Sequence, residues 1–185
     1  MACSLDAATH VSELRTPALA VIRSILERNT STMLARAEKL GCQLRPHVKT
    51  TKTIEGATLQ TGGTKRHITV STLAEANFFA DGGFDDIIYA VPLTADKVAD
   101  VLRLSARLEC FHVMLDSMDG FRAVEDAVRK QAADASLSVV IGIDCGYGRD
   151  GADADAPETL ALAQAVGASA HATVAGIYTH AGHSY

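Results

Sequence analysis

Short apolar runs alternate along this chain with longer segments whose apolar residues recur every three or four positions. This alternation is typical of parallel strands joined by crossover helices. It predicts an α/β fold of about six parallel strands with flanking helices, and it places the strands at residues 44–49, 67–71, 86–90, 111–115, 137–143 and 173–178.

The segments between these strands have the periodicity of amphipathic helices. Residues 98–104 and 121–128 each present one apolar face, which predicts helices that pack on the sheet. Residues 18–21 have a strand-like composition, and a helical pattern follows them as far as Gly41. Glycine commonly ends a helix, so we expect that helix to stop there.

The number of units fits an incomplete barrel. A closed (β/α)8 barrel takes about 250 residues, whereas this chain of 185 residues ends with its sixth strand and the loop after it. We therefore expect residues 1–16 to form an N-terminal extension and residues 17–185 to form a partial (β/α)8 TIM-type barrel. Open sheet edges invite pairing with another chain, so we expect a homodimer.

Charge and composition exclude several classes of partner. Lysine and arginine total 17 against 22 acidic residues, and the basic residues are dispersed, which argues against nucleic-acid binding. No apolar run approaches the roughly 18 residues of a membrane helix, so we expect neither a membrane span nor a secretory signal. A small-molecule partner is the remaining expectation. The cysteines lack CxxC spacing, which favours a reducing, cytoplasmic location; they are Cys3, Cys42, Cys110 and Cys145.

Polar side chains follow several predicted strands, and in parallel α/β folds ligands bind at that edge of the sheet. The strongest signal is the stretch RPHVKTTKT, residues 45–53, which places Lys49 at a strand end among other cations. Neighbouring cations disfavour the protonated form of an amine, and a neutral lysine reacts with aldehydes to form a Schiff base. The alternative interpretation is a solvated basic strand end.

Four segments in a fixed order resemble one family of enzymes. RPHVKTTKT, TVSTLAEANFFADGGFDDIIYAVPL, VVIGIDCGYGRDG and GIYTHAGHSY are similar to segments of the D-serine dehydratase and D-threonine aldolase family, whose N-terminal barrel is of the alanine racemase type. The resemblance extends from about residue 17 to residue 185. It implies pyridoxal 5'-phosphate as cofactor and a D-β-hydroxy amino acid as substrate.

The activity that the resemblance implies first is dehydration of D-serine to pyruvate and ammonia by a pyridoxal-phosphate-dependent lyase. A D-threonine aldolase or an amino-acid racemase would use the same cofactor and lysine. A non-catalytic pyridoxal-phosphate-binding protein or an inactive fragment is a third interpretation.

The resemblance also implies roles for individual residues. Lys49 would form the Schiff base with the cofactor, Arg149 would contact its phenolic oxygen, and His180 would pack against its pyridine ring. For Arg149 the alternative is a surface ion pair with Asp150.

Four further residues are expected near the bound molecules. His183 and Tyr185 would reach the substrate or the phosphate, and they could instead belong to an exposed chain end. His47 and Tyr89 would line the pocket, or they could be ordinary strand-end packing.

The chain departs from the family in two respects. Thr51 stands where the family commonly has a second histidine in the lysine motif, so any proton transfer by that ring is in doubt. In addition, the later phosphate-binding loops and the β-domain with its zinc-ligand histidine and cysteine have no counterpart before Tyr185. We therefore assign no metal ligands, and we expect Cys110 and His112, two residues apart on one strand, to be packing residues.

Overall fold

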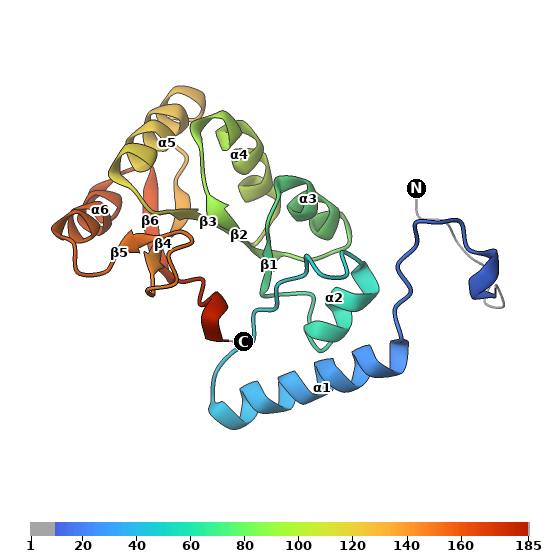
Figure 1. Ribbon diagram of the computed structural model, residues 1–185. Coiled ribbons are helices and arrows are strands. Elements are labelled where there is room, and N and C mark those ends of the chain that lie inside the picture. Colours follow the sequence, from blue (N-terminus) through green and yellow to red (C-terminus); the bar gives the residue numbers. More distant parts are fainter. Residues whose placement is uncertain (1–9, 185) are drawn as a thin grey trace.

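The computed structural model describes residues 10–184, which form one curved parallel sheet with helices around it (Figure 1). The strand order is β1-β2-β3-β4, and both β5 and β6 pair with β4. β6 runs along most of β4, whereas β5 pairs only with its last two residues. The strands are β1 Ile68–Val70, β2 Asp86–Pro92, β3 Cys110–Leu115, β4 Leu137–Asp144, β5 Ala152–Asp153 and β6 Ala172–Tyr178.

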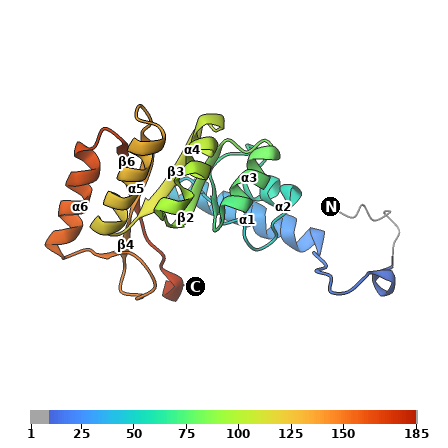
Figure 2. The same cartoon turned by 90° about the horizontal axis from the view of Figure 1, so that it is seen from above.

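Four helices cover the outer face of the sheet, while α1 and α2 lie beyond β1 (Figures 1 and 2). The helices are α1 Arg23–Leu40, α2 Ile54–Gln60, α3 Leu73–Asp81, α4 Val98–Arg107, α5 Met118–Gln131 and α6 Pro157–Ala168. Three single 3-10 turns are η1 Val11–Glu13, η2 Ala95–Lys97 and η3 Gly182–Ser184. No helix in residues 10–184 is long and apolar enough to cross a membrane.

Local sequence signals set the helix ends. The Thr72 hydroxyl accepts a hydrogen bond from the Glu75 N–H at 3.0 Å and begins α3, and Ser117 begins α5 in the same way. Gly41 ends α1 with a φ of 66°, a conformation that glycine adopts without steric cost, so the predicted stop is confirmed.

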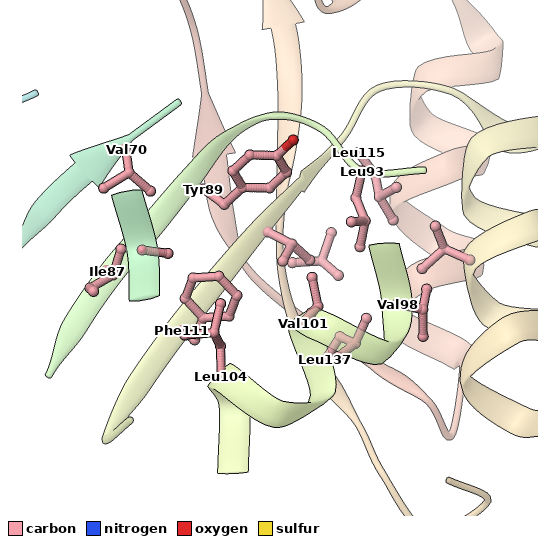
Figure 3. Close-up of a cluster of buried hydrophobic side chains, with 14 of the residues drawn as sticks. Val70, Ile87, Tyr89, Leu93, Val98, Val101, Leu104, Phe111, Leu115 and Leu137 are labelled. Carbon is pink, nitrogen blue, oxygen red and sulfur yellow. The ribbon is translucent and has the colours of Figure 1, made fainter. Parts of the chain in front are cut away.

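The main hydrophobic core lies between the sheet and the outer helices (Figure 3). Alternate strand residues point into it, with Ile87 beside Phe111 and Tyr89 beside Val113 in the register of neighbouring strands. Each large side chain buried there contributes about 1.5–3 kcal/mol. One continuous core therefore joins the strands of the sheet to the helices that cover them.

The opposite, inner face of the sheet is more polar. Thr69, Ile88, His112 and Ser138 follow one another across four strands, and the His112 Nδ1 lies 2.7 Å from the Ser138 Oγ. Burial, more than the neighbouring Arg45 charge, lowers the pKa of His112. The imidazole is thus a neutral hydrogen-bonding group inside the sheet.

A buried acid lies at the amino end of this face. The side chain of Asp86 is 5% exposed, and its two oxygens lie 2.7 Å from the Arg45 Nη1 and 2.8 Å from the His67 Nδ1. Arg45 also donates to the Ile68 carbonyl at 3.3 Å. These contacts tie the start of the lysine motif to the first two strands.

The predicted parallel sheet with flanking helices is confirmed, but the predicted strand at residues 44–49 is wrong. Only one bridge forms there, between His47 and Thr69. Pro46 has no N–H for a ladder, and the chain turns immediately afterwards at residues 48–51. Residues 18–21 form no strand either, and the sixth strand of the sheet is instead the unpredicted two-residue β5.

The sheet is curved but not closed. Among the strands of residues 10–184, β6 pairs with β4 alone. Val174 and Ile177 on β6 are 45% and 79% exposed. The outermost strand therefore presents apolar side chains to solvent.

Candidate active site

Lys49 lies in a tight turn at the carboxyl edge of the sheet. Val48, fully buried, anchors this turn through its N–H, which donates to the Thr69 carbonyl at 3.0 Å, and its own carbonyl accepts from the Lys52 N–H at 3.0 Å. Lys49 itself is exposed, and its side-chain amine makes no hydrogen bond or ion pair with any residue in the range 10–184. A fixed backbone thus presents an unengaged primary amine.

His47 lies beside this amine, and its hydrogen bonds define its tautomer. Its Nδ1 accepts from the Lys49 N–H at 3.3 Å, and its Nε2 lies 3.0 Å from the Ser71 Oγ. Because Nδ1 is an acceptor, the neutral ring carries its proton on Nε2 and donates it to Ser71. The Ser71 hydroxyl proton is then free to point elsewhere.

The protonation of His47 agrees with this arrangement. Burial, followed by the charge of Lys49, lowers the pKa of His47 to about 4, and His180 adds to the effect while Glu75 opposes it. His47 is therefore neutral at neutral pH.

The other cations of the lysine motif are engaged elsewhere. The Lys52 Nζ lies 2.9 Å from the Glu75 Oε1, and Arg45 pairs with Asp86. Burial by itself raises the pKa of Glu75, but the bonds from Lys52 and from the Ser71 N–H, at 2.8 Å, outweigh it and lower the pKa. The sequence led us to expect unpaired cations around Lys49; the structure instead neutralises each neighbour.

Thr51, which stands where the family commonly has a second histidine, packs against α2. Its buried hydroxyl has no hydrogen-bond partner and faces α2, since a Cβ added at Gly56 would lie 2.8 Å from the Thr51 Oγ1. The side chain at this position packs against a helix.

A second part of the candidate site is the loop after β4. The Asp144 Oδ1 accepts from the N–H groups of Gly146 and Gly148, each at 3.0 Å. Gly151 has a φ of 102°, and a Cβ there would lie 2.5 Å from the backbone of β4. Arg149 is exposed on this fixed loop, and it forms no ion pair with Asp150 or with any other residue in the described range. Its guanidinium can therefore meet an anionic ligand.

The segment after β6 completes the site. The His180 and Tyr147 rings are stacked, with centroids 5.9 Å apart and an interplanar angle of 21°. His183 lies on η3 with its ring centroid 5.5 Å from that of Tyr147. Tyr185 lies outside the described residues. Since His180 also acts on the pKa of His47, the ends of β1 and β6 are within electrostatic reach of each other.

Of the predicted site residues, the structure gathers Lys49, His47 and His180 at the carboxyl edge. Tyr89 is only 3% exposed and belongs to the hydrophobic core (Figure 3). Sequence reasoning gave no role to Ser71, whose only signal was its place after a strand.

Glu75, Asp144 and Tyr147 were missed as well. For Tyr147 the only signal was the glycine on each side of it, which predicts a turn and not a contact.

This donor set fits pyridoxal phosphate on chemical grounds. Lys49 offers an amine for its aldehyde, Arg149 a guanidinium for an anionic oxygen, and His180 a flat ring for the pyridine. Among residues 10–184, no three histidine, cysteine, aspartate or glutamate side chains come together as metal ligands.

Comparisons with known proteins agree with this geometry. The chain is 36% identical over 185 residues to D-serine dehydratase of Dictyostelium discoideum, covering 95% of this chain and 47% of the relative. It is 30% identical to D-threonine aldolase of an Arthrobacter species, covering 83% and 40% of the two chains. The solved D-threo-3-hydroxyaspartate dehydratase from Delftia sp. HT23 superposes with a TM-score of 0.82 at 34% identity, covering 92% and 44%.

The chain thus spans less than half the length of these relatives. Residues 23–185 match the sequence profile described as "Alanine racemase, N-terminal domain". The resemblance drawn from four sequence segments is confirmed, and the chain belongs to the family defined by the alanine racemase N-terminal domain.

Proposed function

We propose that this chain is the cofactor-binding part of a pyridoxal-phosphate-dependent lyase that acts on D-β-hydroxy amino acids, with D-serine as the first substrate to test. The observation that carries the proposal is the unengaged amine of Lys49, held by a fixed turn at the carboxyl edge of the sheet. The names of the relatives support the substrate class, since they are dehydratases and an aldolase of D-configured substrates.

When bound, pyridoxal phosphate supplies an aldehyde for an amine and a ring that withdraws electrons from the substrate α-carbon. Lys49 would hold this group covalently, and its amine, once released, would be able to accept a substrate proton. Arg149 would pair with an anionic oxygen and His180 would cover one face of the ring. These roles follow from the side chains that the carboxyl edge presents.

His47 and Ser71 would set the hydrogen bonding around the amine. Since His47 donates its Nε2 proton to Ser71, the Ser71 hydroxyl can give its own proton to a bound anionic group. Lys52 is held by Glu75, which leaves Lys49 as the reactive lysine of the motif.

Chemical trapping tests the assignment within the motif. The protein is incubated with excess pyridoxal phosphate, reduced with borohydride and digested, and the modified lysine is located by mass spectrometry. We expect the adduct on Lys49, its loss in Lys49→Ala, and its retention in the matched control Lys52→Ala. An adduct on Lys52, or no adduct in the unmodified sequence, would refute the proposal.

Product assays then separate the possible activities. Pyruvate release from D-serine, measured with and without added zinc, identifies a dehydratase, and acetaldehyde from D-threonine identifies an aldolase. A trapped adduct without either product would favour the non-catalytic cofactor-binding interpretation.

We also propose that two copies associate through the outer edge of β6. The support is the pair of exposed apolar residues Val174 and Ile177 on a strand that is paired on one side by β4. Such an edge is a template for another strand.

A further inference from the structure

We infer that Tyr147 is a positioning residue, which holds His180 in the orientation that a flat, ring-shaped ligand requires. This inference deepens the proposed function and rests on it for the identity of the ligand. The contact that carries it is the near-parallel stacking of the two rings, at a centroid distance of 5.9 Å and an angle of 21°.

The loop after β4 fixes Tyr147 from both sides. Its neighbours Gly146 and Gly148 have φ values of 87° and 70°, and the N–H groups of both donate to the Asp144 carboxylate. One carboxylate at the end of β4 therefore holds the peptide on either side of the tyrosine. These bonds fix the backbone from which the Tyr147 ring projects.

The segment after β6 is shaped to receive this ring. A Cβ added at Gly182 would lie 2.5 Å from the Tyr147 Cε1 and 2.6 Å from its Cζ, closer than side-chain atoms approach one another. Gly182 does not have a left-handed backbone conformation, so glycine is needed there for space. Tyr147 and Gly182 thus form a matched pair.

His180 is also within electrostatic reach of the lysine turn. After burial and the charge of Lys49, it contributes to the low pKa of His47. Stacking on Tyr147 covers one face of the His180 ring and opposes its rotation. His183, the second ring against Tyr147, steadies η3 in the same way.

Four variants test this role: Tyr147→Ala, Tyr147→Phe, Gly182→Ala and the double variant of Tyr147→Ala with Gly182→Ala. The first readout is the proton NMR spectrum of the ligand-free protein, in which the His180 and His183 ring signals are shifted by the tyrosine ring current. We expect Tyr147→Phe to keep these shifts, and Tyr147→Ala and Gly182→Ala to lose them.

The second readout is the affinity for pyridoxal phosphate, measured by titration. We expect roughly three- to tenfold weaker binding in Tyr147→Ala and in Gly182→Ala, and rescue in Tyr147→Phe. Gly182→Ala should add little to Tyr147→Ala, because the ring it would displace is already gone. Thermal melting of each variant confirms that it is folded.

Two results would overturn the inference: unchanged histidine shifts in Tyr147→Ala, or independent, additive effects of the two substitutions on affinity. Failure of the proposed function looks different. In that case the unmodified sequence forms no adduct at Lys49, while the NMR shifts still report whether Tyr147 holds His180.

Discussion

The low pKa of His47 predicts a loss of stability in mild acid that a single substitution removes. The unfolded chain takes up a proton at an ordinary histidine pKa of 6.5, whereas burial beside Lys49 delays protonation of folded His47 to about 4. Between these values the unfolded state binds more protons, so the free energy of unfolding falls as the pH falls. At neutral pH this contribution to stability is fully present.

The magnitude follows from the same two values. Lowering the pH from about 7.5 to about 4.5 costs about 2.5 kcal/mol by the linkage relation, and partial exposure of the imidazole reduces the expected loss to about 2 kcal/mol. The assay is urea denaturation at both pH values for the unmodified sequence and for His47→Gln. The glutamine variant should lose about 2 kcal/mol less on acidification.

Comparing the two sequences cancels the acid-dependent contribution of Glu75, whose pKa is also lowered. His10→Gln, a change at an exposed histidine bonded only to Ser12, is the matched control and should follow the unmodified sequence. If His47→Gln and the unmodified sequence lose equal free energy, His47 is not a neutral, buried group and its assigned tautomer is wrong.

Two further predictions concern the buried Asp86–Arg45 ion pair and the exposed edge strand β6. Asp86→Asn removes the anion that lies 2.7 Å from the Arg45 guanidinium, and it should lower the free energy of unfolding, measured in urea, by about 3 kcal/mol. The control is Asp100→Asn on the surface of α4, which should lower it by less than about 0.5 kcal/mol. A loss equal to that of Asp100→Asn would show that the buried pair is not stabilising. Ile177→Lys should shift the chain toward monomer in sedimentation experiments, while Leu160→Lys, at a residue 63% exposed on α6, should leave association unchanged.

Strand positions were predictable wherever a strand lies over its own helix. In β2, β3 and β4 the apolar residues from which the strand is predicted are the same residues that pack against the outer helices. The sequence pattern therefore reports the core directly. Residues 44–49 form no ladder, because Pro46 has no N–H to donate and the chain turns at residues 48–51. β5 is only two residues long and has no periodicity to detect.

Part of the candidate site could be predicted from the sequence, and part could not. Lys49 could be found because Arg45, His47 and Lys52 cluster around it within one short motif. The partners of its neighbours could not, since Lys52 meets Glu75 and Arg45 meets Asp86 across different elements of the fold. Counting local cations therefore gave a positively charged environment, which long-range ion pairs in fact neutralise.

The curvature of the sheet brings its two edges toward each other (Figure 1). His47 forms a bridge with β1 on the edge that faces away from β2, and His180 follows β6. The two histidines therefore belong to opposite edges of the sheet (Figure 1). A flat sheet would hold them several strands apart, yet His180 contributes to the lowered pKa of His47. Strand twist curves the sheet, and the outer helices pack on its convex side through the main hydrophobic core (Figure 1). The geometry around Lys49 should therefore depend on the outer core as much as on the residues of the loops themselves.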